Sequence, residues 1–404
     1  MTGIWKIEKM LLTELRVLDL TDEKASLCSK LLADMGARVI KIERPGGDAS
    51  RDAGPFIGNE PHSEKSLSFF YNNTGKLGIT LNIEHIKGRE IFYELLKKND
   101  VIVENFAPGY FNKLKINCEN FKNINPKLII TSVTGFGQTG HRRYYKTCDL
   151  VASAYGGQMF VTGASKPLKH YGEQAYLTAS LFAAVGVLLA IRDQRKTGRG
   201  EHVDISIQEA VTSTLEHVLV RFFYENKIAK RQGPLHWNHL FHILPCKDGF
   251  IQITLFDKWD TLVEWLNREG MAQDLIDNRF NDERFRLKHL DHIINVLRKW
   301  AQTRTKNELF ELGQLMQFPW APVHSPREVV ESAQLIEREF FQDVCQTGNN
   351  IFKKCLRIPF TLNPPRSNPI THAPLIGEHN IQIYHKEMGI SIKELNELSS
   401  LGVI

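Results

Sequence analysis

Basic side chains gather in or near the loops that follow predicted β-strands. Lysine and arginine bind phosphate oxygens through charge-assisted hydrogen bonds, so these loops can hold an anionic ligand. A solvated basic surface is the alternative that composition leaves open. The residues are Lys76, Lys113, Arg142, Arg143 and Lys146.

The segment Gly135-Phe-Gly-Gln-Thr-Gly140 has the GxGxxG spacing that brings backbone amides against a pyrophosphate in dinucleotide folds. In those folds the motif forms the first turn between a strand and a helix. In this chain it comes late and continues into His141-Arg-Arg-Tyr-Tyr-Lys146. We therefore favour a flexible turn beside another kind of active site over nicotinamide or flavin binding, and a plain turn remains the other alternative.

Other catalytic patterns are missing from the sequence. It has no GxSxG elbow, Walker loop or HExxH motif, and its six cysteines lack metal-ligand spacing, so we expect no metal site. The net charge of +5, from 51 basic and 46 acidic residues, is too even for a nucleic-acid-binding protein. The first residues lack a secretory pattern, and the apolar run 181–191 is half a membrane span. We expect a cytoplasmic protein that binds neither nucleic acid nor membrane.

Short strands and helices alternate from the amino end of this 404-residue chain, which predicts an α/β fold with an open parallel sheet. In such sheets ligands bind at the carboxyl ends of the strands. We therefore expect the site among the loops at 43–45, 104–106 and 134–137. The predicted strands cover 15–21, 37–43, 78–83, 100–104, 128–133 and 201–206.

The alternating pattern breaks around 226–236, where basic segments surround Gly233-Pro234. A new strand over 247–254 and helices through about 317 predict a second domain. Prolines at 319, 322 and 326 then mark a return segment.

Several separated blocks of sequence resemble one family, the class III CoA-transferases. This family includes formyl-CoA:oxalate and carnitine CoA-transferases and the related α-methylacyl-CoA racemases. One such block is Asp100-Val-Ile-Val-Glu-Asn-Phe-Ala-Pro-Gly109. All of them, in family order, are 15–20, 32–48, 100–109, 134–140, 195–206, 247–251, 318–323 and 373–379.

The resemblance implies a Rossmann-like large domain over 1–225, a small α/β domain over 226–330, and a segment over 331–404 that returns to the large domain. Two such chains form an interlocked dimer. Coenzyme A or an acyl-CoA is the implied substrate, and no cofactor is bound permanently. The positions that match coenzyme A contacts in relatives are Arg44, Lys76, Asn105, Phe106, Lys113 and Lys146.

The family's nucleophile is an aspartate that forms a mixed anhydride and then an enzyme-CoA thioester. Counting back from Thr197-Gly198 places this position at Tyr176. A phenol is a poor nucleophile at neutral pH, and its ester is not an activated anhydride. Glu173 is the only nearby carboxylate in the sequence, and its longer side chain is the alternative nucleophile. Racemases need the same aspartate and a histidine where this chain has Cys148.

These features predict a CoA-transferase subunit that is not itself catalytic and pairs, as a heterodimer or heterotetramer, with a homologous catalytic subunit. It would move CoA from an acyl-CoA such as succinyl-CoA to a carboxylic acid. Benzylsuccinate, an intermediate of anaerobic toluene breakdown, is the acid used by a family member with two unlike subunits. Two alternatives stay open: a self-sufficient homodimeric transferase that uses Glu173, and an acyl-CoA-binding regulatory protein.

Overall fold

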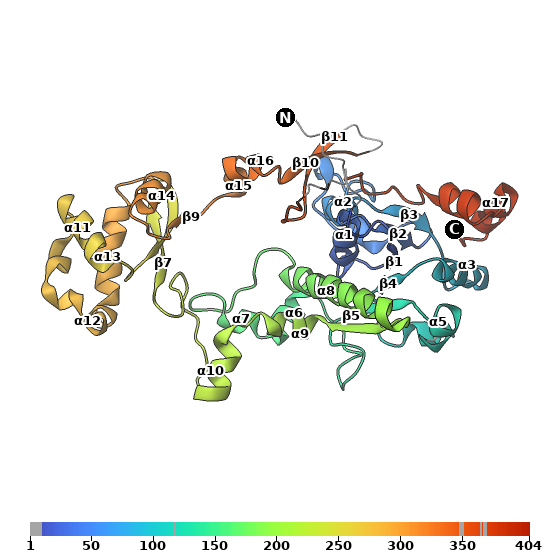
Figure 1. Cartoon of the computed structure of the whole chain (residues 1–404), viewed down its shortest axis with the longest axis horizontal. Helices are drawn as coiled ribbons and strands as arrows, with labels where there is room; N and C mark the ends of the chain where they lie inside the picture. The colour runs from blue at the N-terminus through green and yellow to red at the C-terminus, as the bar shows by residue number, and fades with distance from the viewer. Residues whose placement is uncertain (1–9, 117, 347–350, 364–365, 367–369) are drawn as a thin grey trace. The chain divides into compact units, whose positions relative to one another are not determined.

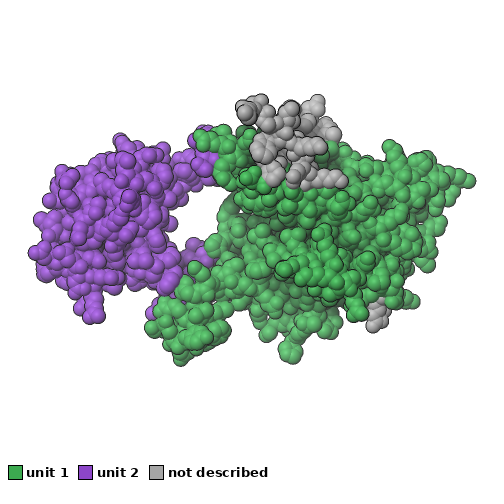
Figure 2. All heavy atoms as spheres, in the orientation of Figure 1, with its two compact units in different colours: residues 1–159, 169–227, 336–404 green, residues 160–168, 228–335 purple. Residues whose placement is uncertain are grey.

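The computed structural model describes residues 10–116, 118–346, 351–363, 366 and 370–404. The chain divides into two compact units, coloured separately in Figure 2. Unit 1 holds residues 1–159, 169–227 and 336–404, and unit 2 holds residues 160–168 and 228–335.

The core of unit 1 is a six-stranded sheet in the order β3-β2-β1-β4-β5-β6 (Figure 1). Every neighbouring pair is parallel. The predicted α/β class with a parallel sheet is therefore confirmed. Strand order reverses between β1 and β4, and a crevice opens at such a point in doubly wound sheets. The strands are β1 (Arg16–Leu20), β2 (Arg38–Glu43), β3 (Leu77–Thr80), β4 (Val101–Glu104), β5 (Ile129–Thr134) and β6 (His202–Ser206).

Helices cover both faces of this sheet because successive strand residues point to opposite sides. Val17 of β1 packs in one buried cluster with α1 (Ser26–Asp34) and α8 (Gln174–Thr197). The next residue, Leu18, packs in a second cluster. That cluster contains residues of α3 (Ile86–Lys97), α5 (Cys118–Ile124), the π-helix η5 (Ile381–Glu387) and α17 (Ile392–Ser400).

The remaining helices of unit 1 are short and connect or flank the sheet. They are η1 (Ala49–Asp52), η2 (Ile57–Asn59), α2 (Leu67–Asn73), α4 (Tyr110–Lys113), α6 (Asp149–Tyr155), α9 (Ile207–Ser213) and α10 (His217–Glu225). A hairpin of β10 (Phe341–Gln346) and β11 (Ile351–Leu356) precedes the C-terminal helices. Two further helices, α7 (Gln158–Val161) and α16 (Ala333–Glu337), contain the junctions between the units.

By length and composition α8 is long and apolar enough to cross a membrane. Half of its most apolar window is nevertheless buried inside the protein. Its buried side is built from small residues such as Ala179 and Ala183, so the helix lies close to the sheet. At Gly186 an added Cβ would stand 2.7 Å from Val203 of β6.

Unit 2 contains a three-stranded antiparallel sheet, in the order β7-β8-β9, packed with helices. Its core includes the buried side chains of Trp300 and Trp320. Residues 160–168 also belong to unit 2, which the sequence patterns did not predict. Gly233 N donates a hydrogen bond to Gly163 O and connects this segment to the rest of the unit. The elements are β7 (Phe241–Cys246), β8 (Gly249–Thr254), α11 (Trp259–Arg268), η3 (Gln273–Ile276), η4 (Asn278–Asn281), α12 (Glu283–Lys288), α13 (Leu290–Ala301), α14 (Lys306–Leu315), β9 (Ala321–Pro322) and α15 (Pro326–Val330).

The C-terminal residues of unit 1 bind the edge strand β3. Thr80 donates its backbone N–H to Asn380 Oδ1 at 2.9 Å, and its carbonyl accepts from the Tyr384 hydroxyl at 2.7 Å. Farther along, Asn82 N donates to Val403 O. This segment therefore fixes the start of the loop after β3.

Gly200 lets the turn after α8 lie close to the backbone of Leu128, the residue before β5. An added Cβ would stand 2.0 Å from Leu128 O, so backbone has to move. We expect Gly200→Ala to lower the free energy of unfolding by about 1–3 kcal/mol. Denaturant unfolding measures this, with Arg199→Ala at the exposed neighbouring position as the control. Equal stability of the two variants would show that the close approach is not needed.

Candidate functional site

A cavity of about 300 Å³ lies at the carboxyl ends of β1, β2 and β4. This is the side of the sheet, and the reversal of strand order, where doubly wound folds bind ligands. Arg44, Asn105 and Phe106 line it, so the structure brings these three predicted residues together. They follow β2 and β4, as the strand-end argument from sequence requires.

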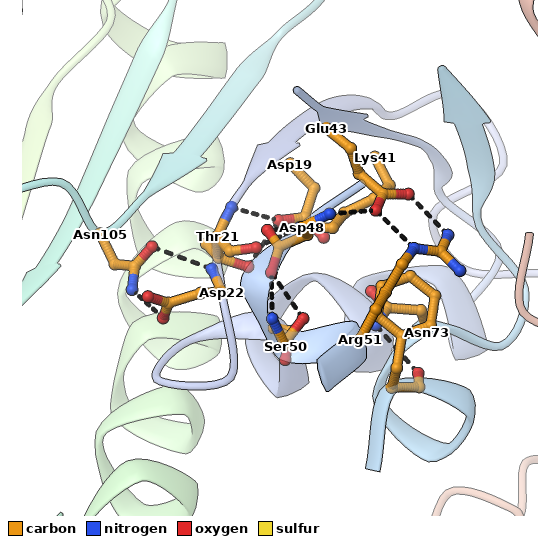
Figure 3. Close-up of polar contacts among 12 residues, drawn as sticks. Asp19, Thr21, Asp22, Lys41, Glu43, Asp48, Ser50, Arg51, Asn73 and Asn105 are labelled. Carbon is orange, nitrogen blue, oxygen red and sulfur yellow. Dashed lines mark hydrogen bonds and ion pairs between the residues drawn. The ribbon is translucent and has the colours of Figure 1, made fainter. Parts of the chain in front are cut away.

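Asn105 connects the two loops on either side of the strand-order reversal. Its side-chain oxygen accepts the backbone N–H of Asp22 at 3.0 Å, and its amide nitrogen donates to the Asp22 carboxylate (Figure 3). Asp22 also pairs with Lys24. The first residue after β4 is thereby fixed against the loop after β1, on the cavity wall.

Aromatic and charged groups form the outer part of the cavity. The rings of Phe106 and Tyr110 stack with centroids 4.3 Å apart. Glu84 Oε1 accepts from the Tyr110 hydroxyl at 2.8 Å and from the Arg44 guanidinium at 3.2 Å. The side chain of Arg44 is 69% exposed and that of Glu84 is 50% exposed. A planar apolar surface beside a solvated cation is suited to a nucleotide with phosphates.

Figure 3 shows a group of buried and half-buried charges, of which Glu43 and Asp48 line the cavity. Lys41 donates to Thr21 O and pairs with Asp48 at 3.3 Å. Arg51 binds Glu43 through two nitrogens, at 2.6 and 2.7 Å. Each of these charges therefore has a hydrogen-bond or ion-pair partner, which offsets part of the cost of removing it from water.

Lys76 is not part of the cavity lining. Its ammonium group is buried and donates to Asp19, Asn73 and the carbonyl of Ser26 at 2.7–3.0 Å. Burial lowers the pKa of Lys76 to about 8, and Asp19 only partly offsets this effect. Burial alone would raise the pKa of Asp19, but Lys76 and Lys41 lower it to about 2. In this structure the Lys76 ammonium group therefore links β1, α1 and α2.

The other two predicted lysines are exposed and also lie outside the cavity lining. Lys113 ends α4, and Lys146 lies in the loop that follows the glycine motif. In that motif, Gln138 N donates to both oxygens of Asp204 at 2.9 and 3.1 Å. The backbone N–H of Gln138 in the glycine-rich turn is therefore already hydrogen-bonded to a carboxylate of the protein.

Tyr176 lies in the first turn of α8, where its side chain is buried and only 4% of the residue is exposed. Asp149 Oδ1 accepts the backbone N–H groups of Ala175 and Tyr176 at 2.9 and 3.3 Å, which fixes the start of the helix. Burial, with the charges of Glu23 and Glu173, raises the pKa of Tyr176 well above 10. The phenol therefore stays protonated at neutral pH.

Glu173 precedes α8 and is exposed. Burial and the charge of Asp149 raise its pKa. Glu173 is the nearby carboxylate in the sequence, and the fold adds Glu23 from the loop after β1, whose charge also acts on the Tyr176 phenol. Glu23 was missed because it stands far away in the sequence, although the convergence of strand-end loops was a signal for it.

Glu104, at the end of β4, is a buried group that sequence reasoning did not single out. It accepts the backbone N–H of Phe106 at 2.7 Å. Burial raises the pKa of Glu104 to about 7, against the effect of hydrogen bonds from Ser132 and Phe106. This carboxyl group thus supports the loop that carries Asn105 and Phe106. In the part of the chain that the structure describes, no group of three or more His, Cys, Asp or Glu is arranged to hold a metal ion.

Comparison with known proteins shows which protein family has this sequence and fold. The model of CoA-transferase family III matches residues 12–380. The chain therefore belongs to CoA-transferase family III, whose members use CoA thioesters as substrates, and the predicted family is confirmed.

Individual relatives match over nearly the whole chain. Succinyl-CoA:(R)-benzylsuccinate CoA-transferase subunit BbsE of Thauera aromatica is 32% identical over 400 residues, which are 96% of this chain and 97% of the relative. Succinyl-CoA:mesaconate CoA-transferase of Haloarcula hispanica is 32% identical over 382 residues, 92% of this chain and 95% of the relative. The crystal structure of a CaiB/BaiF family protein from Brucella suis superposes with a TM-score of 0.83 at 26% identity, covering 94% of this chain and 100% of that one.

The raised pKa of Glu104 has a consequence for stability. The folded state keeps the proton up to about pH 7, whereas an unfolded glutamate loses it near 4.5. The stabilisation that this group gives below pH 4.5 is therefore lost as the pH rises to 7. Relative to Glu104→Gln, the wild type should lose about 2–3 kcal/mol of unfolding free energy between pH 5 and pH 8. Denaturant unfolding at both pH values measures this loss, and exposed Glu397→Gln is the control. Parallel pH profiles for wild type and Glu104→Gln would contradict the assignment.

Proposed function

We propose that this chain is one subunit of a CoA-transferase that moves CoA from succinyl-CoA to a carboxylic acid, and that a homologous subunit supplies the nucleophile. The observation that carries the proposal is Tyr176. The resemblance places the nucleophile at this position, and the side chain there is a buried phenol with a raised pKa. The cavity with Arg44, Asn105 and Phe106 supports retained CoA binding.

The chemistry of transfer explains why the replacement matters. A carboxylate attacks the acyl-CoA thioester and releases the CoA thiolate, which then attacks the enzyme carbonyl of the anhydride and releases the donor acid. The acceptor carboxylate next attacks the enzyme thioester, which releases the CoA thiolate and forms a new anhydride. The thiolate then attacks the acceptor carbonyl of that anhydride, which forms the acceptor's CoA thioester and frees the enzyme carboxylate. A phenol ester does not offer this pair of activated carbonyls, so the sequence of steps needs a carboxylate.

The substrates in this proposal rest on the relatives. Both curated relatives described above are named for succinyl-CoA, so we assign succinyl-CoA as the donor. Their acceptors differ. We assign benzylsuccinate because the protein named for it is also named as a subunit, which matches the partner that this chain requires.

The exposed side of α8 supports a protein partner. Large apolar side chains recur there at helical spacing, and exposed apolar residues grouped on one side of a helix favour a protein–protein interface. We propose that the homologous catalytic subunit covers this surface in an interlocked dimer. The residues are Leu181, Phe182, Val185 and Leu189, each 45–58% exposed.

One observation favours a second candidate, a homodimeric transferase that uses its own glutamate. Glu173 is exposed and acts electrostatically on Tyr176, so a carboxylate is present beside the expected position.

Covalent trapping separates these functions. The purified chain is incubated with succinyl-CoA, quenched with hydroxylamine or borohydride, and digested for mass spectrometry. We expect no label on Tyr176, Glu173 or Glu23, because the chain lacks a competent nucleophile. Label on Glu173 that disappears in Glu173→Gln would establish the homodimeric transferase instead. CoA binding with no transfer in any pairing of subunits would indicate a regulatory protein.

A substitution on the exposed side of α8 tests the partner surface. Val185→Lys places a charge in the proposed interface and should weaken association with the catalytic subunit at least tenfold. Native mass spectrometry or light scattering of the mixed subunits measures this change. Ile392→Lys is the matched control, because Ile392 is an exposed apolar residue on α17. Equal association of both variants would remove this side of α8 from the interface.

A further inference from the structure

The outer part of the cavity contains the Glu84 carboxylate beside two groups, the Arg44 guanidinium and the Tyr110 hydroxyl, that can donate hydrogen bonds to a phosphate. A single oxygen, Glu84 Oε1, accepts from both the Arg44 guanidinium and the Tyr110 hydroxyl. These residues come from three different segments: the loop after β2, the loop after β3 and the start of α4. All three line the cavity.

A bound phosphate and the Glu84 carboxylate would compete for the same hydrogen-bond donors. Arg44 and Tyr110 offer one cation and one hydroxyl beside the stacked rings of Phe106 and Tyr110. An anionic ligand that binds there meets the negative charge of Glu84 and must separate it from Arg44. Because Arg44 and Glu84 are both largely exposed, their ion pair is weak and can be broken at modest cost.

We infer that Glu84 is an internal competitor for the phosphates of CoA and sets the affinity of the cavity. This inference rests on the proposed CoA binding at this cavity. Without ligand, Glu84 holds Arg44 and Tyr110 together. When CoA binds, its phosphate takes the Arg44 guanidinium, and Glu84 turns to solvent. The carboxylate thus weakens binding of anionic ligands and leaves binding of neutral ones unchanged.

The opposite role for Glu84 is that it positions Arg44 for the ligand. The two roles predict opposite changes in CoA affinity when Glu84 is neutralised. If Glu84 competes, its neutralisation tightens CoA binding, whereas if it positions Arg44, its neutralisation weakens CoA binding.

Isothermal titration with CoA and with pantetheine, which carries no phosphate, distinguishes these roles. We expect Glu84→Gln to lower the Kd for CoA about five- to tenfold at low salt and to leave the Kd for pantetheine unchanged. The gain should shrink at high ionic strength, because exposed charges are screened. Glu90→Gln, an equal charge change at an exposed position of α3, should change the Kd for CoA less than twofold.

A double variant tests whether Arg44 mediates the effect. In an Arg44→Gln background, Glu84→Gln should tighten CoA binding less than it does in the wild type, because only the direct repulsion between Glu84 and the phosphates is then removed. An undiminished gain would overturn the competition for Arg44. Glu84→Ala repeats the test with a side chain that has no amide group, so a hydrogen bond from a glutamine amide to the phosphate cannot account for the gain.

The failures of the two proposals are distinguishable. Unchanged or weaker CoA binding by Glu84→Gln, with wild type still binding CoA, overturns the competitor role alone. An equal gain with pantetheine also overturns it, because the effect would then not depend on phosphate charge. Absence of CoA binding in wild type and in every Glu84 variant overturns both the inference and the proposed use of the cavity.

Discussion

The contact between Asn105 and Asp22 holds the candidate site together. β1 and β4 are neighbours, but the chain after β1 leads to α1 on one face, and the chain after β4 leads to Phe111 of α4 on the other. Loops that leave in opposite directions open a crevice. Asn105 spans it with one accepted and one donated hydrogen bond, and this fixes Phe106 on the cavity wall.

The neighbouring buried charges connect this part of the molecule to the C-terminal segment at Ile376. Arg51 binds Glu43 beside the cavity, and it also pairs with Glu64, which accepts the backbone N–H of Ile376. The ion pairs offset the cost of removing these charges from water, and they join segments that are far apart in sequence. Such a network explains how the C-terminal segment supports the cavity without lining it.

Much of the architecture could be predicted from the sequence, because period-2 apolar strands alternate with amphipathic helices. That pattern also placed Arg44, Asn105 and Phe106, which directly follow strands, among the residues of one cavity. The pattern could not predict the contacts of Lys76, because its acceptors include Asp19, 57 residues away, and the carbonyl of Ser26, 50 residues away.

Other features depend on tertiary structure that no local pattern contains. The excursion 160–168 belongs to unit 2 through hydrogen bonds with residues beyond 230. Glu23 faces Tyr176 only because the loop after β1 meets the start of α8. The strong shift in the pKa of Glu104 likewise comes from its burial in the folded sheet.

The central proposal is that this chain has a cavity for CoA and lacks a competent nucleophile at one position, Tyr176. The most direct measurement is intact-mass spectrometry of Tyr176→Asp after incubation with succinyl-CoA, with the melting temperature confirming that the variant is folded. The account predicts a covalent CoA adduct that is absent from Tyr176→Asn. A folded Tyr176→Asp that forms no adduct would contradict the claim, because more than the nucleophile would then be missing.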